Sequence, residues 1–255
     1  MIDLHCHILP GVDDGPKTID ESLKMALKAR EQGITHLMCT PHHKNGRFLN
    51  PATNVANEVA KLQTEFDRNN IELKLLVGQE NRITGTLIED LEKREIIGFG
   101  QQKQFLLIEF PTNDVPLYAT KLFFELIAKG YIPIIVHPER NRIFINDPNK
   151  LLPFLDMGAL AQGTAPSIVG LFGRKIQKTA KTMIQLNMVQ MIASDAHSLE
   201  KRNFYLKEAY HIIQKDYGNE KVKSLKKMPM DILYENKIEP FTYKRVKHRR
   251  FSFFR

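Results

Sequence analysis

The sequence predicts an α/β fold in which parallel strands and helices alternate along a single chain. Short runs rich in apolar and β-branched residues are separated by longer segments with helical spacing, which is the pattern of repeated βα units. The strand runs are almost wholly apolar, as expected for strands buried on both faces. At 255 residues, a closed TIM-like barrel of about seven units is the economical arrangement, and a doubly wound open sheet is the alternative.

The predicted elements follow one another in a regular order. Thr18 and Glu21 form a capping box, and apolar residues then recur at helical spacing until Gly33, which predicts the first helix. Pro41 closes the second strand run. The predicted strands cover residues 1–4, 34–40, 73–78, 105–110, 132–136, 159–162 and 189–193, and the later helices cover 51–68, 84–93, 116–129, 149–156, 167–186 and the chain from Asn203 onward.

The composition excludes several classes of protein. Hydrophobic residues make up 42% of the chain and charged residues 26%, a balance typical of globular proteins. No apolar run approaches the roughly 18 residues that a membrane span requires. Two cysteines, Cys6 and Cys39, cannot form a disulfide framework in a chain of this length. We therefore expect a cytoplasmic protein, in a reducing compartment, without a cleavable leader.

The net charge of +8 is confined to the end of the chain. Residues 221–255 hold 11 basic and 3 acidic residues, whereas residues 1–220 hold 26 of each. We expect a barrel domain over 1–240 and a basic tail over 241–255. Because the tail mixes basic and aromatic residues, it is a candidate for contact with the inner face of the membrane or with an acidic partner. A solvated tail is the alternative, and no nucleic-acid binding is expected.

Residue types that bind metals recur at the predicted carboxyl ends of the strands. His5 and His7 lie two residues apart in extended backbone, so both imidazoles point to the same side, and Asp195 and His197 repeat that spacing. The carboxyl ends of parallel strands meet on one rim, which brings distant residues together. The nine candidate ligands are His5, His7, Asp14, His42, Glu80, Glu109, His137, Asp195 and His197.

The remaining histidines and one cysteine have simpler explanations. His36 lies inside a predicted strand and is expected to be a core residue, and His43 is a neighbour of His42 without a role of its own. His211 and His248 are expected on the surface. Cys6 is interpreted as a small residue at the strand end that faces away from the metals.

The candidate donor set fits borderline and hard divalent ions. Five imidazoles and four carboxylates suit manganese, iron or zinc, whereas a calcium site would consist of oxygen ligands alone. Three such ions would leave a surplus of about two positive charges over the carboxylates, which attracts a dianion such as a phosphate group. Arg140 and Arg202 follow His137 and His197, and guanidinium groups bind phosphoryl oxygens bidentately. A surface salt bridge is the alternative role for each arginine.

The motifs that carry these residues resemble a known superfamily. They are MIDLHCHILPGVDDGP at residues 1–16, Thr40-Pro41-His42, Gly78-Gln79-Glu80, Val136-His137-Pro138-Glu139-Arg140 and Ser194-Asp195-Ala196-His197. The set is similar to that of the polymerase and histidinol phosphatase (PHP) superfamily. More narrowly, it resembles the manganese-dependent protein-tyrosine phosphatases encoded with capsule and exopolysaccharide genes of Gram-positive bacteria. The resemblance extends to about Tyr234.

This resemblance implies a PHP fold, a distorted TIM-like barrel of seven βα units, with three metal ions. Manganese is the expected ion, with iron, zinc or magnesium as alternatives. The implied ligands are His5, His7, Glu80 and Asp195 for the first ion, Glu80, Glu109 and His137 for the second, and Asp14, His42 and His197 for the third. The implied substrate is phosphotyrosine in the tail of a membrane-linked tyrosine kinase that controls polysaccharide assembly.

The expected chemistry is hydrolysis by a metal-activated hydroxide without a phosphoenzyme. Arg140 and Arg202 would neutralise charge on the phosphoryl oxygens, and Asp14, or a metal-bound water beside it, is the candidate proton donor. The sequence lacks the Cys-x5-Arg motif of cysteine-dependent phosphatases and the Asp-x-Asp motif of aspartyl-phosphate enzymes. The alternatives are a histidinol-phosphate phosphatase, a nuclease or phosphodiesterase of the same superfamily, and a non-catalytic module that binds anions or membranes.

Overall fold

The computed structural model describes residues 1–235, 238 and 241–247, and every pair of adjacent named strands in it is parallel. The strands are β1 (Ile2–Cys6), β2 (His36–Cys39), β3 (His42–His43), β4 (Lys74–Val77), β5 (Glu80–Arg82), β6 (Phe105–Glu109), β7 (Ile132–Val136), β8 (Leu160–Thr164) and β9 (Met191–Ala193). All seven predicted strands are confirmed. Two short strands lie outside the predicted ranges: β3 follows β2 after Pro41, which has no N–H for a ladder, and β5 follows β4 after Gly78 and Gln79.

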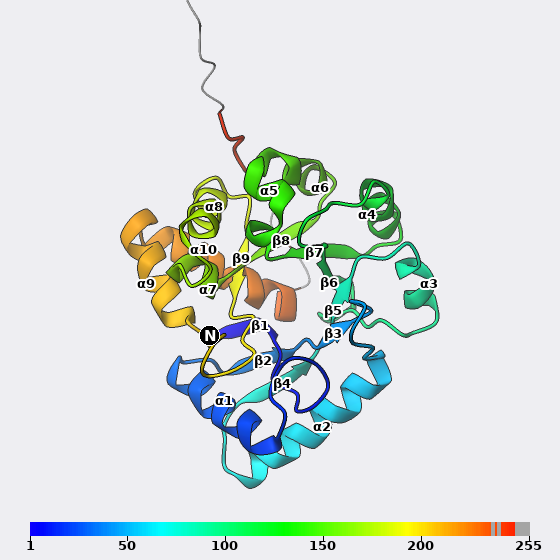
Figure 1. Ribbon diagram of the computed structural model, residues 1–255, viewed down its shortest axis with the longest axis vertical. Helices are drawn as coiled ribbons and strands as arrows, with labels where there is room; N and C mark the ends of the chain where they lie inside the picture. Colours follow the sequence, from blue (N-terminus) through cyan, green and yellow to red (C-terminus); the bar gives the residue numbers. More distant parts are fainter. Residues whose placement is uncertain (236–237, 239–240, 248–255) are drawn as a thin grey trace, which may run out of the picture.

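The strands follow one another around a barrel-like ring (Figure 1). One sheet has the order β1-β2-β4, and the other has the order β3-β5-β6-β7-β8-β9. The last strand returns to the first, because the Asp195 N–H donates to the His5 carbonyl at 2.9 Å and the His7 N–H donates to the Ala196 carbonyl at 2.9 Å. This return excludes the doubly wound open sheet and brings Asp195 beside His5.

Most helices lie on the outer side of the ring, whereas Met228, Ile232 and Leu233 from the last described helical segment pack against the buried cluster inside it (Figure 1). The helices are α1 (Ile19–Glu31), α2 (Ala52–Arg68), α3 (Leu87–Glu92), α4 (Ala119–Ala128), α5 (Arg142–Asn146), α6 (Leu152–Asp156), α7 (Ala165–Val169), α8 (Arg174–Gln185), α9 (Leu206–Tyr217) and α10 (Asn219–Met230). Shorter turns are η1 (Pro138–Arg140), η2 (Pro148–Leu151) and the π-helical η3 (Asp231–Glu235). The Thr18 hydroxyl caps α1 by accepting from the Glu21 N–H at 3.3 Å, as the sequence predicts.

The prediction of one continuous helix over 167–186 is wrong. The segment forms α7 and α8, separated by a loop whose flanking residues Gly170 and Gly173 both have φ of +91°. A residue in this left-handed conformation cannot continue an α-helix, and glycine adopts it without a steric penalty. The predicted helix over 149–156 likewise begins as the 3-10 turn η2 before it becomes α6.

Apolar side chains fill the inside of the ring away from the candidate ligands. Ile2 and Leu4, Phe105 and Leu107, and Ile134 and Val136 are alternate residues of β1, β6 and β7, and all belong to one buried cluster. The alternation is expected because successive side chains of a strand point to opposite faces. A second and larger buried cluster lies between the strands and the helices. The polar rim therefore rests on a packed apolar interior, which holds its side chains in place.

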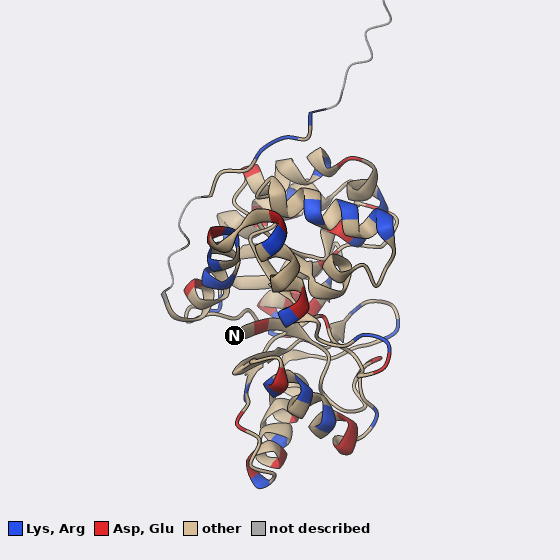
Figure 2. Cartoon of the chain, turned by 90° about the vertical axis from the view of Figure 1, so that its left-hand side faces the viewer, with Lys and Arg blue, Asp and Glu red and all other residues tan. Residues whose placement is uncertain are grey.

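The described end of the chain, residues 241–247, lies against the barrel and leaves it beside α5 and α6 (Figure 1). The Asn149 amide donates to the Val246 carbonyl at 3.1 Å, and the Lys244 N–H donates to the Leu186 carbonyl at 2.8 Å. Tyr243 and Val246 pack against the larger core cluster. Figure 2 shows basic residues along this segment. The expected boundary at residue 240 remains a prediction, and residues 248–255 of the expected tail lie outside the described residues.

Candidate metal centre

The structure brings all nine candidate ligands together at the carboxyl ends of the strands. Each has a ligand atom within 3.8 Å of a ligand atom of another member of the set. Eight of the nine residues are buried, and the Asp14 side chain is 49% exposed. Nine potential ligands from segments nearly 200 residues apart thus form one network. Their role as metal ligands remains a prediction.

Four of these residues form a group with the dimensions of a single ion site. The His5 and His7 Nε2 atoms are 3.2 Å apart, and each lies 3.3–3.5 Å from Glu80 Oε2 and from Asp195 Oδ1. Ligands at about 2.1 Å from a metal in a tetrahedral arrangement are about 3.4 Å from one another. These distances fit a single ion held by His5, His7 and Glu80, with Asp195 beside the two histidines, and the four-residue set for the first ion remains a prediction.

Glu80 also connects this group to two further histidines. Its Oε1 accepts a hydrogen bond from His137 Nε2 at 2.8 Å, and its Oε2 lies 2.7 Å from His42 Nδ1. Glu109 Oε2 lies 3.8 Å from His42 Nδ1. Among the described residues, His42, Glu80 and Glu109 form a group whose ligand atoms are close enough to hold one ion. The family resemblance instead predicts His137 as the histidine of this group. The central position of Glu80 agrees with its expected bridging role.

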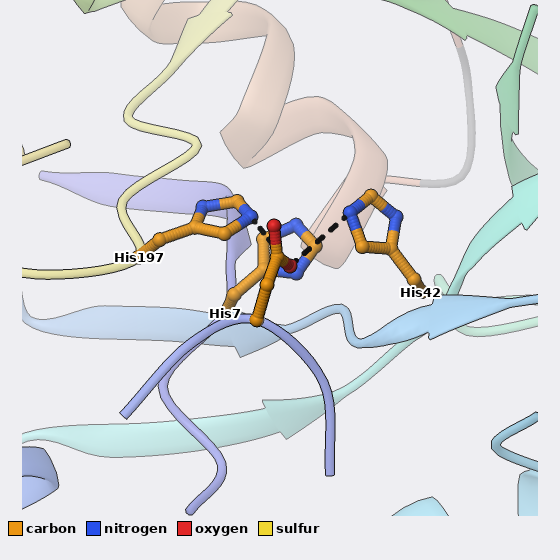
Figure 3. A group of neighbouring side chains, drawn as sticks. His7, His42 and His197 are labelled. Atoms are coloured by element: carbon orange, nitrogen blue, oxygen red, sulfur yellow. Dashed lines mark ion pairs between the residues drawn. The ribbon is translucent and has the colours of Figure 1, made fainter. Parts of the chain in front are cut away.

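A third group lies at the more exposed side of the centre (Figure 3). Asp14 Oδ1 lies 3.5 Å from His42 Nε2 and 3.3 Å from His197 Nε2, and the two imidazoles approach it from opposite sides. These are the three residues expected for the third ion. His7 lies close to the same group, and its ring stacks on that of His197 with centroids 3.7 Å apart.

Several buried ligand atoms in this centre lack a hydrogen bond within the described residues. They are His42 Nδ1, Glu80 Oε2, Glu109 Oε2, Asp195 Oδ1 and His197 Nε2. A buried polar atom without a partner costs about 1–3 kcal/mol, and a buried charge costs more. All five atoms belong to candidate ligands, and divalent cations would satisfy them. The donor set and these ligand atoms without a hydrogen bond therefore fit a site for several metal ions.

Neighbouring groups orient the histidines that are candidate ligands. Asp13 Oδ2 accepts from His7 Nδ1 at 2.6 Å, and Gln162 Oε1 accepts from His5 Nδ1 at 2.9 Å. A protonated Nδ1 leaves Nε2 free as the metal-binding atom, which is the usual function of such outer partners. A side chain at Gly15 is excluded, since its Cβ would lie 2.3 Å from the His7 carbonyl oxygen. The loop after β1 is thereby held against His7.

Three further residues lie in the centre although the sequence does not predict a role for them there: Asp13, Gln162 and Arg82. Arg82 ends β5, and its Nη2 lies 3.0 Å from Glu109 Oε2. Gln162 ends the predicted strand 159–162, so the rule that selects residues at strand ends would have identified it. Asp13 is adjacent to Asp14, but the sequence does not indicate which of the two carboxylates faces His7.

Arg140 and Arg202 both contact the same carboxylate oxygen. Arg202 Nη2 donates to Asp195 Oδ2 at 2.7 Å, and Arg140 Nη1 donates to the same atom. Arg202 Nη1 also lies 3.9 Å from Asp14 Oδ2. The side chains of Arg140 and Arg202 are 26% and 23% exposed, so both lie at the opening of the centre. This placement fits contact with an anion that enters from solvent.

Burial and charge shift the protonation of the centre. Burial and the charge of Arg140 lower the pKa of His137 to about 4. Burial and the charge of His7 lower the pKa of His197 to about 4. Burial and then Glu80 raise the pKa of Glu109 to about 7. Burial alone would lower the pKa of His7, but the Asp13 carboxylate overcomes it and raises the value to about 10. Neutral His137 and His197 are suited to metal binding.

The predictions for the remaining histidines and for Cys6 are confirmed at some positions and wrong at others. The expectation that His36 is a core residue is wrong: it begins β2, is partly exposed, and bonds to Thr35 at 3.0 Å. His43 is buried and accepts from the Asn50 N–H at 3.2 Å, which is a structural role. His211 is exposed as predicted, and His248 lies outside the described residues. Cys6 packs in the larger core cluster between the strands and the helices, and burial raises the pKa of its thiol.

The chain matches a family model over most of its length. The model is described as capsular polysaccharide synthesis, CpsB/CapC, and it matches residues 1–234. The chain is 41% identical over 220 residues to the tyrosine-protein phosphatase YwqE of Bacillus subtilis, with 86% of each chain covered. It is 42% identical over 211 residues to a putative tyrosine-protein phosphatase, CapC, of Staphylococcus aureus, with 83% and 82% covered.

Solved structures give the same result for the fold. One from a study of YwqE from Bacillus subtilis and CpsB from Streptococcus pneumoniae, described as metal-dependent tyrosine phosphatases, superposes with a TM-score of 0.93 at 38% identity. The match covers 97% of this chain and 100% of that chain. A variant of the organophosphorus hydrolase from Deinococcus radiodurans has a TM-score of 0.55 at 12% identity, over 91% of this chain and 92% of that one, and shares the fold alone.

Proposed function

Since the chain belongs to the capsular polysaccharide synthesis family CpsB/CapC, we propose that it is a metal-dependent protein-tyrosine phosphatase. The family resemblance inferred from the motifs is confirmed by the family model. The observation that carries the proposal is the convergence of nine candidate ligands, with five buried ligand atoms among them that lack a hydrogen bond within the described residues. A packed site of this kind is costly for folding and is explained by a catalytic centre.

The candidate ligands would hold the ions in three groups. His5, His7, Glu80 and Asp195 would hold the first ion; Glu80 and Glu109 would hold the second with His137 or His42; and Asp14, His42 and His197 would hold the third. Divalent ions bound there would supply a hydroxide at neutral pH and polarise the phosphoryl group. We propose manganese as the ion, with iron, zinc or magnesium as alternatives.

The chain's own residues would bind and orient the substrate. Arg140 and Arg202 at the opening would bind the phosphoryl oxygens and neutralise the charge that develops there. Burial by itself would raise the pKa of Asp14, but the contact with His197 overcomes this effect and the pKa is lowered. Because its carboxylate stays ionised, Asp14 is better suited to cation binding than to proton donation. A phenolate leaving group has a parent pKa near 10, so it needs little proton donation.

A cysteine nucleophile is disfavoured by the same structure. Cys6 and Cys39 are fully buried, and burial raises the pKa of both thiols. A thiol in this environment stays protonated, and the thiolate is the reactive form. The protonated state of both thiols therefore agrees with the absence of the Cys-x5-Arg motif that a cysteine-dependent phosphatase requires.

The proposed substrate is a phosphotyrosine protein, and more narrowly a membrane-associated tyrosine kinase of polysaccharide synthesis. The phosphatase itself would then be located in the cytoplasm, near the inner face of the membrane. None of the described helices is both long and apolar enough to cross a bilayer.

Removing residues 244–255 and measuring cosedimentation with anionic vesicles tests whether the end of the chain holds the enzyme at a membrane. Unchanged partitioning would reject that role.

The function is tested by comparing three substrates. A phosphotyrosine peptide, histidinol phosphate and a single-stranded oligonucleotide are incubated with the protein, with and without chelator and with added manganese. We expect rapid turnover of the peptide alone, abolished by chelation and restored by manganese. Faster turnover of histidinol phosphate or of the oligonucleotide would favour the corresponding member of the superfamily instead.

A further inference from the structure

One long segment of the barrel contains basic residues and no acidic ones. Residues 157–194 include Arg174, Lys175, Lys178 and Lys181 but neither aspartate nor glutamate, although residues 1–220 as a whole are balanced in charge. Arg174, Lys175 and Lys178 lie in the first turns of α8 and are exposed. The balanced total therefore conceals a local positive surface.

This surface adjoins the opening of the candidate metal centre. Helix α8 contacts η1, which contains Arg140, and it also contacts α5. Lys175 Nζ donates to Asn146 Oδ1 at 3.2 Å, which places the first turn of α8 beside the end of α5. Arg142 is exposed at the start of α5, two residues after Arg140. We refer to Arg142, Arg174, Lys175 and Lys178 as the rim patch.

The charges of the rim patch are not neutralised within the described part of the chain. None of its four residues has a carboxylate within ion-pair distance there, whereas Lys181, later on α8, pairs with Asp216 at 2.7 Å. Lys28 on α1 and Lys61 on α2 each have a glutamate partner, whereas Lys207 and Lys215 on α9 are exposed without an ion pair among the described residues. The rim patch thus offers a group of basic side chains to a ligand from outside.

Apolar residues connect the rim patch to the site. Phe172 lies in the loop before α8, and the Arg140 guanidinium lies over its ring, 5.2 Å from the centroid. Leu171 beside it is 45% exposed. Arg140 therefore contacts Asp195 in the centre on one side and the loop that leads to the rim patch on the other. A segment bound at Arg140 would extend over Leu171 and Phe172 toward Arg174.

The other recess beside the centre has a different charge balance. Asp14, Glu21 and Glu200 line this recess of about 360 Å³ together with Lys24 and His197. It therefore carries three carboxylates and one lysine, whereas the rim patch consists of basic residues alone. A flat anionic membrane would meet both the recess and the rim patch, whereas an acidic stretch of peptide on one flank of a phosphotyrosine meets only the rim patch.

We propose that the rim patch binds acidic residues on one side of the target phosphotyrosine and so selects among protein substrates. The inference rests on the proposed phosphatase function and specifies its substrate class. Binding would consist of exposed ion pairs, each contributing modestly and weakened by salt. It would affect the capture of peptides and not the chemistry of the phosphate group.

The test compares phosphotyrosine peptides that differ only in charge beside the tyrosine. Three glutamates are placed before the phosphotyrosine in one peptide and after it in another, and glutamines replace them in a neutral peptide. We expect one acidic peptide to exceed the neutral one by about fivefold in kcat/KM at low salt, with little difference at high salt. The double variant Arg174→Glu, Lys175→Glu should abolish or reverse this preference.

Two controls separate the inference from general effects of charge. Lys74→Glu, Lys215→Glu makes the same charge change at exposed positions at the start of β4 and the end of α9, away from the opening, and should keep the preference. Turnover of p-nitrophenyl phosphate, which is too small to reach the rim patch, should change by less than about twofold in both double variants.

Equal kcat/KM for acidic and neutral peptides would overturn the inference while leaving the phosphatase function intact. Failure to hydrolyse even the neutral phosphotyrosine peptide would overturn the proposed function and the inference with it. Absence of a peptide preference, combined with binding to phosphatidylglycerol vesicles that is lost in Arg174→Glu, Lys175→Glu, would assign the rim patch to a membrane and also overturn the inference.

Discussion

Substituting Asp13 by asparagine should weaken metal binding without removing a candidate ligand. The Asp13 carboxylate is buried and accepts from His7 Nδ1 at 2.6 Å, from the Gly15 N–H at 2.9 Å and from the His42 N–H at 3.2 Å. Asparagine has one carbonyl oxygen in place of two carboxylate oxygens. Its NH2 group must therefore face either Gly15 or the pair formed by His7 and His42.

The cost of this change follows from the bonds lost. If the NH2 group faces His7, Nδ1 must accept and the ring proton moves to Nε2, the atom that faces Glu80 and Asp195. If it faces Gly15, one backbone bond to the loop is lost. A hydrogen bond to a charged group contributes about 1.5–3 kcal/mol, and loss of such an outer partner lowers metal affinity about 10- to 100-fold.

Manganese titration of activity and of protein-bound metal measures this effect. We expect the manganese concentration for half activation to rise about 10- to 100-fold in Asp13→Asn, with kcat largely recovered at saturating manganese. Asp114→Asn, which removes one exposed charge, is the matched control and should behave like the unmodified protein. An unchanged titration curve in Asp13→Asn would show that Asp13 does not orient His7 for metal binding.

Three further predictions concern the ions, the arginines and the thiols. Chelation should lower the melting temperature by roughly 5–10 °C, since bound ions stabilise the folded state and a domain of this size shifts by about 2–4 °C per kcal/mol; a scan with and without chelator tests this, and no shift would contradict a loaded site. Arg140→Lys keeps the charge but loses the planar fork and the contact with Phe172, so kcat on a phosphotyrosine peptide should fall about 10- to 100-fold; near-normal kcat would remove Arg140 from phosphate binding. Iodoacetamide at pH 7.5 should leave activity unchanged because burial raises the pKa of Cys6 and Cys39; rapid inactivation of the native protein would refute this.

The positions of the strands and of the candidate ligands could be predicted because both depend on local patterns. Apolar runs bounded by Gly and Pro locate the strands, and parallel βα topology decides that all their carboxyl ends share one rim. Once the ends meet, a His-x-His after β1 and an Asp-x-His after β9 must face each other. The observed 3.5 Å between His5 Nε2 and Asp195 Oδ1 follows from this topology.

The local pairings within the centre could not be predicted in the same way. Which of His42 and His137 lies beside Glu109 depends on how two side chains bend over the rim, and sequence spacing carries no information on that. The break between α7 and α8 was predictable in principle, because Gly170 and Gly173 lie within the proposed helix. The exposure of His36 depends on where β2 begins, and strand ends are the least certain feature of a sequence pattern.

The direction of the ligands departs from simple strand alternation, and the backbone shows how. Ile2 and Leu4 point into the barrel, so continued alternation would turn His5 and His7 outward; the register shift between Asp3 and Cys6 reverses this and turns them to the centre. After Val136, which points inward, His137 reaches Glu80 from a left-handed backbone with φ of +37°, and Asp195 has φ of +52°. Such conformations cost about 1–2 kcal/mol in non-glycine residues. The fold therefore accepts strain and a bulge at the positions that aim the candidate metal-binding side chains, which is explained by selection for the geometry of the centre and not by selection for stability.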